Sequence, residues 1–418
     1  MSRSIVTPPA KAGSHRIMRI GMRMVSVNGL MSRSVFTAKL LAILLLPSVR
    51  TVLRCARSNK RTRTSNSFSP SLNLLKMMGS ESTWRLAMRI LVNLPAGFFT
   101  RLELKPIFDR LHQMGQIRCT SYDTPEQIAE DLCWAQAVIM WSWPTLSEQM
   151  LDRAKDLQYL GQIDVDCPTA KAAMERGIAM SLSKGGWSPA VAELALGLML
   201  SCLRKTSEYH IQMRSATETW VENFPTDIDG NERQLTGRSV GIVGLGRIGQ
   251  RLAQLLQPFN ITLHVTDPYV SDAVLKKYQA KRVSIDELCE MSEVLVLCAA
   301  ENDGTRKVID EDQIQRLRKQ AVFINVARSA LVDYHALAKR LEQGDVIAAL
   351  DVFDEEPLSK DHVLRNLPNT YLTPHRGGGL VESLNRCVGW LVDDLQALQR
   401  KERRLHAMDQ SMLIALGG

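Results

Sequence analysis

The sequence predicts an α/β protein made of two units, each with a parallel sheet. Apolar strand patterns alternate with helix patterns between residues 88 and 373, which is typical of parallel strands with helices on both faces. The second unit has six strand patterns, the first of which runs into a glycine-rich turn, and six is the strand number expected of a single open sheet. The ~100 residues before that second unit contain a shorter series of their own, enough for another domain.

The first unit is expected over residues 88–187 and the second over residues 188–378. In the first unit the strand patterns are short and apolar, at residues 89–94, 137–140, 157–160 and 178–181, with helices near 104–114 and 169–176. In the second unit the strand patterns lie at residues 240–243, 261–266, 294–297, 322–326, 346–352 and 371–373. Ser284 and Glu287 predict a capping box at the start of one helix, and Asp333 precedes another.

The most specific motif is the turn Gly244-Leu-Gly246-Arg-Ile-Gly249, which follows an apolar strand and opens an amphipathic helix. Gly244 permits the tight turn, Gly246 lets the backbone approach a pyrophosphate, and Gly249 allows the helix to pack close to the strand. Free N–H groups at the start of the helix favour a negative charge there. The pattern predicts a dinucleotide site, against the alternative of a glycine-rich turn in some other α/β protein.

An acidic residue follows at the distance that this site requires. Asp267 ends the next strand, 18 residues after Gly249. A carboxylate at this place can accept hydrogen bonds from the adenosine ribose diol, and it would repel a 2′-phosphate. The sequence therefore favours NAD over NADP as the cofactor.

Charge is distributed unevenly along the chain. The formal net charge is +8, but the first 80 residues hold 14 Lys and Arg and neither Asp nor Glu. Subtracting those 14 from the total of 52 leaves 38 basic against 44 acidic residues in the rest of the chain. This balance gives no electrostatic case for nucleic-acid binding. The apolar run at residues 40–46 is too short to span a bilayer. We therefore expect no nucleic acid and no membrane as partner.

Residues 1–87 are expected to lie outside the fold, because they are rich in Ser, Arg and Met and lack the sequence signals that mark where helices and strands begin and end. Three interpretations stay open: an organelle transit peptide, a signal segment, and a leader added by an early start codon, which we favour. The eight cysteines show no C-x-x-C pair or regular spacing. We therefore expect reduced core cysteines in a cytoplasmic protein, and no metal site.

Three reactive side chains follow carboxyl ends of strands in the second unit, where ligands bind in open α/β sheets: Arg328, Glu356 and His375. A guanidinium can hold a substrate carboxylate in a fork. An imidazole exchanges a proton near neutral pH, and a carboxylate bonded to it fixes its orientation. Each residue has a structural alternative: a helix cap or surface ion pair for the arginine, a solvated turn for the glutamate and an ordinary loop position for the histidine. Their joint placement favours hydride chemistry on a keto or hydroxy acid.

Three motifs resemble the signature blocks of the D-isomer-specific 2-hydroxyacid dehydrogenases, a family that includes phosphoglycerate dehydrogenase and glyoxylate/hydroxypyruvate reductase. They are Asn325-Val-Ala-Arg328, Asp351-Val-Phe-Asp-Glu-Glu356-Pro357 and Thr373-Pro-His375, and they occur in the family order. The resemblance covers about residues 88–398. It implies two Rossmann-like domains, with the dinucleotide-binding domain inserted in the substrate domain, which residues 379–418 complete through a crossover helix and tail.

The resemblance also implies roles for individual residues. Arg328 would bind substrate, His375 would be the acid/base, and Glu356 would pair with the histidine. The implied cofactor contacts are Gly244, Gly246, Arg247, Ile248, Gly249, Asp267, Ala327 and Asp351, the last near the carboxamide. A homodimer is usual in the family.

The main departure from the family pattern lies in the glycine loop that receives the substrate carboxylate. It reads Gly161-Gln-Ile-Asp-Val-Asp-Cys-Pro-Thr169, so at most one of two expected glycines survives. Loss of a glycine stiffens the backbone, and Asp164 adds negative charge near the expected anion site. Phe98-Phe99 and Trp141-Ser-Trp143-Pro144 can add aromatic bulk to the same pocket, or at least one of these pairs is buried in the core.

Taken together, these residues predict an NAD-dependent oxidoreductase of a small 2-hydroxy or 2-keto acid. Hydride would move between C4 of nicotinamide and C2 of the acid, while His375 moves the matching proton. The alternative is an NAD(H)-sensing binding protein of the same fold, like the corepressors that resemble this family, with little or no turnover. The altered loop at residues 161–169 keeps that alternative open.

Overall fold

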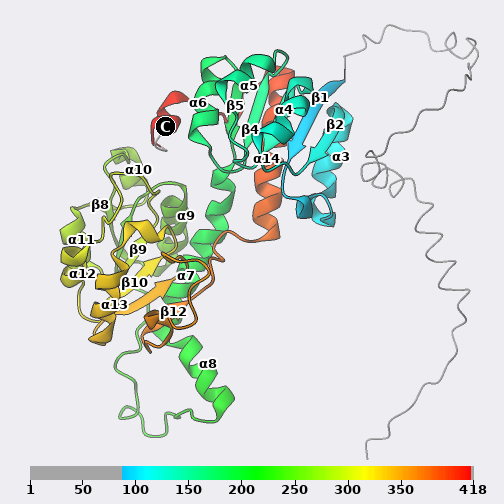
Figure 1. Ribbon diagram of the computed structural model, residues 1–418. Coiled ribbons are helices and arrows are strands. Elements are labelled where there is room, and N and C mark those ends of the chain that lie inside the picture. Colours follow the sequence, from blue (N-terminus) through cyan, green and yellow to red (C-terminus); the bar gives the residue numbers. More distant parts are fainter. Residues whose placement is uncertain (1–86, 416–418) are drawn as a thin grey trace, which may run out of the picture. The chain divides into compact units, whose positions relative to one another are not determined.

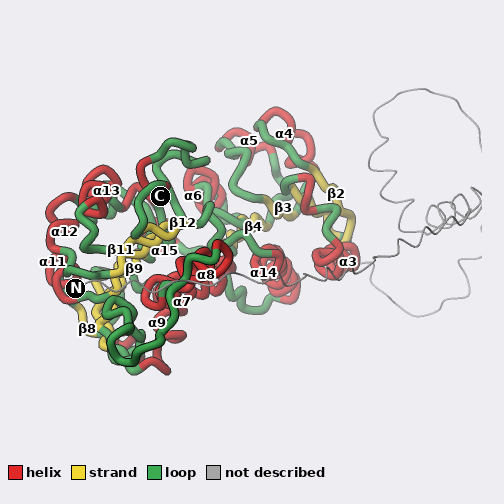
Figure 2. The backbone as a smooth tube through the Cα atoms, turned by 90° about the horizontal axis from the view of Figure 1, so that it is seen from below, coloured by secondary structure: helices red, strands yellow, loops and turns green. Residues whose placement is uncertain are grey.

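The computed structural model describes residues 87–415, and they contain two sheets in which every strand pair is parallel (Figure 1). The expected leader, residues 1–87, lies outside the described residues except for its last residue. Helices flank the strands of both sheets (Figure 2). The predicted fold class, α/β with two parallel-sheet domains, is confirmed.

The first sheet has five strands in the order β2-β1-β3-β4-β5. They are β1 (Met88–Asn93), β2 (Gly115–Thr120), β3 (Ala137–Met140), β4 (Tyr159–Gln162) and β5 (Ala179–Leu182). Its helices are α3 (Lys105–Met114), α4 (Pro125–Trp134), α5 (Glu148–Arg153) and α6 (Cys167–Glu175). The sequence does not predict the edge strand β2, because its residues are all at least partly exposed and offer no buried apolar face.

The second sheet has seven strands in the order β12-β11-β10-β9-β6-β7-β8. They are β6 (Ser239–Val243), β7 (Thr262–Thr266), β8 (Lys281–Arg282), β9 (Val294–Leu297), β10 (Val322–Asn325), β11 (Ile347–Leu350) and β12 (Thr370–Leu372). The six predicted strands are all present, and β8 is a two-residue addition at the edge. The chain order reverses between β6 and β9, so the ligand crevice of an open sheet is expected beyond the carboxyl ends of these strands.

Five helices flank the second sheet, and two of them begin where the sequence predicts a capping residue. They are α9 (Arg247–Leu256), α10 (Asp272–Lys277), α11 (Ile285–Met291), α12 (Glu311–Arg316) and α13 (Tyr334–Glu342). Ser284 and Glu287 form the predicted capping box at the start of α11. The Asp333 carboxylate accepts a hydrogen bond from the Ala336 N–H at the start of α13, at 3.0 Å.

Two long helices link the sheets along the chain. α7 (Ser188–Arg204) contacts β10 and β11 of the second sheet, and the shorter α8 (Thr206–Ser215) follows it. α14 (Val381–Arg400) comes after β12 and contacts β3, β4 and β5, and the chain then reaches α15 (Gln410–Ala415). The chain therefore returns to the first sheet after completing the second, as the fold class requires.

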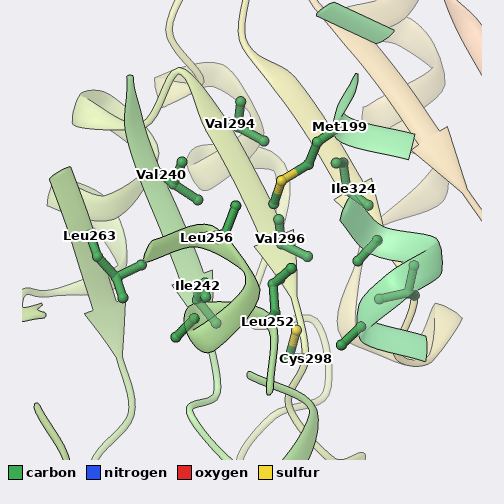
Figure 3. Close-up of a cluster of buried hydrophobic side chains, with 14 of the residues drawn as sticks. Met199, Val240, Ile242, Leu252, Leu256, Leu263, Val294, Val296, Cys298 and Ile324 are labelled. Carbon is green, nitrogen blue, oxygen red and sulfur yellow. The ribbon is translucent and has the colours of Figure 1, made fainter. Parts of the chain in front are cut away.

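The segment Lys184–Arg204 is long and apolar enough to cross a membrane by length and composition, with a mean hydropathy of 1.4. Its apolarity has an explanation in the fold. Ala192, Ala195 and Met199 are fully buried against the second sheet, in a core that α9 completes (Figure 3). Burial of each large aliphatic side chain contributes about 1.5–3 kcal/mol. The apolar character of α7 therefore follows from its packing between sheet and neighbouring helix.

Cysteines contribute to these cores as small apolar residues. None of the seven cysteines in residues 87–415 forms a disulfide, and Cys202, Cys289, Cys298 and Cys387 are buried. Burial raises the pKa of the Cys298 thiol to about 12, so it stays protonated at neutral pH. The expected cytoplasmic location stays a prediction.

Candidate active site

The glycine-rich turn joins β6 to α9 and leaves open space at one position. Gly244 has a φ of +86°, and a Cβ there would lie 2.6 Å from the Ala299 Cα atom, so only glycine fits. A Cβ on Gly249 would lie 2.3 Å from the Gly244 carbonyl oxygen. A Cβ on Gly246, in contrast, would meet nothing within 4 Å. Gly244 and Gly249 thus fix the turn, and Gly246 borders open space in which a ligand can approach the backbone.

Asp267, just after β7, fastens the same turn. Its Oδ2 accepts the Leu245 N–H at 2.7 Å, and its Oδ1 accepts the N–H groups of Tyr269 at 2.8 Å and Val270 at 3.0 Å. The half-buried carboxylate has further lone pairs that a ribose hydroxyl can use. α9 begins after Gly246 without a side-chain cap, so its first N–H groups are available to an anion. These features fit a dinucleotide, and the ribose role of Asp267 stays a prediction.

The remaining cofactor contacts predicted from the sequence lie on both sides of this turn. Arg247 is the first residue of α9, and its side chain runs over Gly185, where a Cβ would lie 2.6 Å from Arg247 Cδ. Ile248 is half-buried and packs against the core of the second sheet. Ala327 is buried in the loop after β10. The structure describes these positions, and their contacts with the cofactor stay predictions.

Arg328 is held by a network at the end of β10. Asn325, the last residue of this strand, is fully buried, and its Oδ1 accepts the Ala327 N–H at 3.0 Å. Its Nδ2 donates to the Arg328 carbonyl at 2.9 Å and to the Tyr334 hydroxyl at 3.3 Å. Tyr334 in turn donates to the Val352 carbonyl at 2.5 Å. The Arg328 backbone is therefore fixed, while its side chain is exposed and donates to the Ala327 carbonyl at 2.6 Å.

His375 and Glu356 meet directly. His375 Nδ1 lies 2.7 Å from Glu356 Oε2, and Glu356 Oε1 accepts the Phe353 N–H at 2.9 Å. Burial is the largest influence on Glu356 and opposes its ionisation. The hydrogen bonds from His375 and Phe353, with the charges of His375 and Arg328, outweigh that influence and lower the pKa of Glu356. Glu356 is therefore a carboxylate at neutral pH and accepts the Nδ1 proton of His375.

Asp351 anchors the loop that carries His375. The Asp351 side chain is 1% exposed. Its Oδ1 accepts the Thr373 hydroxyl at 2.5 Å and the Arg376 N–H at 2.8 Å, and its Oδ2 accepts the Gly377 N–H at 2.8 Å. His375 itself has a φ of +49°, a left-handed conformation that costs about 1–2 kcal/mol without such support. The hydrogen bonds of the Asp351 side chain go to this loop, and its predicted contact with the carboxamide stays a prediction.

A family model described as "D-isomer specific 2-hydroxyacid dehydrogenase, NAD binding domain" matches residues 196–377. A glyoxylate reductase from Aeropyrum pernix is 32% identical over 239 residues, which are 56% of this chain and 69% of that protein. This chain belongs to the D-isomer specific 2-hydroxyacid dehydrogenase family. The resemblance predicted from the three sequence motifs is confirmed, and NAD is the cofactor of its nucleotide-binding domain.

Two further relatives show how much of the chain the family accounts for. The D-3-phosphoglycerate dehydrogenase of Methanocaldococcus jannaschii is 30% identical over 286 residues, 68% of this chain and 53% of that protein. A solved structure of a protein from Pyrococcus horikoshii OT3 is 25% identical, with a TM-score of 0.65, and the match covers 78% of this chain and 96% of that one. The chain spans about half the length of the D-3-phosphoglycerate dehydrogenases that it matches. The relatives are named as dehydrogenases and reductases, which does not favour the sensor alternative.

In this member of the family, the altered glycine loop differs from the expectation in one respect. Gly161 is a buried residue of β4, where a Cβ would lie 2.9 Å from Tyr159 Oη and 3.1 Å from Leu391 Cδ2. Gly161 is therefore required by packing beneath α14 and gives no flexibility to the loop. Beyond the strand, Asp164 forms an ion pair with Lys184 at 2.8 Å.

Sequence reasoning does not identify the residues that hold the site in place. Asn325 and Tyr334 fix the backbone of Arg328, and Thr373 helps Asp351 to hold the loop of His375. Asn325 lies in the motif that resembles the family, and a polar residue ending an otherwise apolar strand is the one signal that marks it. Tyr334 carries no such signal, because a tyrosine at the start of an amphipathic helix is ordinary.

Proposed function

We propose that this chain is an NAD-dependent dehydrogenase of a 2-hydroxy or 2-keto acid, with His375 as the acid/base, Glu356 as its partner and Arg328 as the substrate-binding residue. The observation that supports it most is the 2.7 Å contact between His375 Nδ1 and Glu356 Oε2. Both lie in loops after neighbouring strands of the sheet that carries the glycine-rich turn. Bound NAD would accept a hydride from C2 of the hydroxy acid, or NADH would return one to the keto acid.

The protonation of the pair follows from its geometry. An ionised Glu356 only accepts hydrogen bonds, so Nδ1 of His375 carries the proton that joins them. Nε2 is then the atom that takes the hydroxyl proton of the substrate during oxidation and returns it to the carbonyl oxygen during reduction. Arg328 presents a planar fork suited to the substrate carboxylate. Its exposed side chain donates to the Ala327 carbonyl, a hydrogen bond that it can exchange for one to an arriving anion.

The test is replacement of the histidine. His375→Ala should lower kcat by about 10²–10⁴-fold, the usual contribution of one general acid–base residue. NADH affinity, followed by nucleotide fluorescence, should change little. His335→Ala on α13 is the matched control, because His335 is an exposed histidine of the same domain. Equal kcat in His375→Ala and its parent would remove the histidine from the mechanism.

We also propose that the chain forms a homodimer through α8 and the segment after it. Ile211, Trp220 and Phe224 are 65%, 67% and 80% exposed, and they are large apolar side chains that lie close together in the sequence. A cavity beside α8 is lined in part by Leu198, Ile211 and Tyr371. Exposed apolar side chains and a cavity in one region of the chain suit a two-fold contact, in which the side chains of each copy enter the cavity of the other. Sedimentation of Phe224→Asp should show monomer, and a dimer of unchanged stability would refute this contact.

A further inference from the structure

Three tryptophans gather at the carboxyl ends of the first sheet. Trp141 and Trp143 follow β3, and Trp187 lies in the short helix η3 (Lys184–Trp187) after β5. The ring centroid of Trp141 is 5.3 Å from that of Trp143 and 5.9 Å from that of Trp187. The edge of Phe98 contacts Trp141 as well, at 5.7 Å. We call Trp141, Trp143 and Trp187 the tryptophan cluster.

The cluster reaches the loop that carries the acid/base histidine. A Cβ on Gly378 would lie 3.2 Å from Cε3 of Trp187 and 3.6 Å from its Cβ, so the Trp187 side chain lies close to the backbone there. Gly378 is three residues after His375, in the loop that Asp351 holds. An aromatic surface from the first sheet therefore borders the loop from which the proton is exchanged. A substrate at His375 has this surface as its neighbour.

Trp143 is the member of the cluster that lies outside the core. All three indoles are half-buried, but Trp141 and Trp187 pack against the core beneath α14, whereas the Trp143 ring lies beside Trp141 at an interplanar angle of 50°. Its backbone is nevertheless fixed. Asn93, 1% exposed at the end of β1, donates from Nδ2 to the Trp143 carbonyl at 3.2 Å and to the Tyr122 carbonyl at 3.1 Å. A positioned and partly exposed indole is a surface ready to cover an apolar group.

An ion pair lies at the same edge of the sheet. Lys184 begins η3, three residues before Trp187, and its ammonium is paired with Asp164 at 2.8 Å. Both side chains are about one-third exposed. An ammonium already paired with a carboxylate attracts a further anion less, and Asp164 itself would repel one. This pair therefore gives little attraction to a phosphate or a second carboxylate on the substrate.

From these contacts we infer that the substrate is a 2-keto or 2-hydroxy acid with a bulky, uncharged side chain, aromatic or branched apolar, that packs on the tryptophan cluster. The inference rests on the proposed function, which places the reacting carbon at His375. What it adds to that function is the class of substrate. One well-packed aromatic contact changes affinity by about tenfold, and the cavity left when that contact is removed adds to the loss.

The test is a panel of 2-keto acids assayed by NADH oxidation. The parent should have a kcat/KM for phenylpyruvate and 4-methyl-2-oxopentanoate at least about tenfold above that for oxaloacetate, 2-oxoglutarate and 3-phosphohydroxypyruvate. Trp143→Ala should lower kcat/KM for phenylpyruvate by about tenfold, through KM, and change the value for pyruvate less than threefold or so. Trp143→Phe should restore most of the loss.

Trp134→Ala is the matched control. Trp134 is a half-buried tryptophan of the same sheet, but it precedes β3 and so lies at the opposite edge, stacked under Arg118. It should leave the order of substrates unchanged, and melting temperatures of all three variants report folding. No turnover of any keto acid by the parent would refute the proposed function. Turnover with a preference for the anionic side chains, or a Trp143→Ala loss that is equal for phenylpyruvate and pyruvate, would overturn this inference alone.

Discussion

The contact between Glu356 and His375 makes a sharp prediction for the substitution Glu356→Gln. Glu356 uses two separate acceptor atoms, Oε1 for the Phe353 N–H at 2.9 Å and Oε2 for His375 Nδ1 at 2.7 Å. An amide of the same shape has one acceptor oxygen and one NH2 group. If the oxygen keeps the Phe353 N–H, the NH2 group faces Nδ1 and selects the imidazole tautomer with its proton on Nε2. That tautomer cannot accept a proton from a hydroxy acid.

The size of the effect follows from the exposure of the pair. In buried sites a wrong tautomer can cost about 10⁴-fold in kcat. Here the His375 and Glu356 side chains are 46% and 37% exposed, so water can replace part of the lost interaction. We therefore expect a fall in kcat for the oxidation direction of about 100-fold, or ~2.7 kcal/mol. Steady-state oxidation of a 2-hydroxy acid at saturating NAD measures it, with His375→Ala as the lower limit.

The neighbouring substitution Glu355→Gln is the control for this experiment. Glu355 belongs to the same acidic turn and is exposed, but its side chain has no contact with His375. Glu355→Gln removes the same formal charge one residue away. Its kcat should stay within about twofold of the parental value, because exposed charges act weakly at a distance. Equal losses in Glu355→Gln and Glu356→Gln would show that net charge, and not orientation of the imidazole, supports activity. Parental kcat in Glu356→Gln would refute the pairing as a catalytic requirement.

Three further predictions concern the cofactor turn, the histidine loop and pH. Asp267→Ala should weaken NAD binding by about tenfold or more and NADP binding far less, because it removes the ribose acceptor and the repulsion of a 2′-phosphate together; an unchanged NAD/NADP ratio in titrations would exclude that role. Asp351→Asn places an NH2 group against backbone donors and should lower kcat and the melting temperature together, by about 1–3 kcal/mol in stability; a parental thermal melt would contradict it. The lowered pKa of Glu356 contributes stability that is fully present above the usual value of 4.5 and is lost as pH falls through the lower folded value. Melts of the parent and Glu356→Gln should therefore converge only below pH 4.5.

The sequence predicts the fold where hydrophobic patterns are strong, and it fails where they are weak. The central strands of both sheets are buried runs such as β9 and β10, which cannot be confused with exposed loops. The edge strands β2 and β8 have no buried face, so their hydrogen-bonding partners alone define them. α4 is short and its helix pattern is weak, although Thr124 caps it. Edges of sheets are thus set by tertiary pairing, which a single sequence does not encode locally.

The candidate site also has a part that the sequence predicts and a part that it does not. Arg328, Glu356 and His375 are predictable because each stands just after a strand, and strand ends of a parallel sheet share one edge. The contact of Trp187 with Gly378 is not predictable, because it joins residues 191 positions apart through the packing of η3. The packing role of Gly161 is not predictable for the same reason, because Leu391, one of the two neighbours that it contacts closely, is distant in the sequence.

Two buried polar residues explain how the side chains of this site are both exposed and well placed. Asn325 ends β10 and Asp351 follows the neighbouring strand β11, and they are 0% and 1% exposed. Asn325 accepts an N–H group from the loop beyond its own strand, and Asp351 accepts N–H groups from the loop beyond the next strand, β12. An apolar residue in either place would leave buried donors unpaired, at about 1–3 kcal/mol each. The loop past Asn325 carries Arg328, and the loop held by Asp351 carries His375. Because the anchors act on the backbone, the guanidinium and imidazole need no burial of their own to be oriented. They stay accessible to a substrate and to its proton, which a site fixed by side-chain packing would not allow.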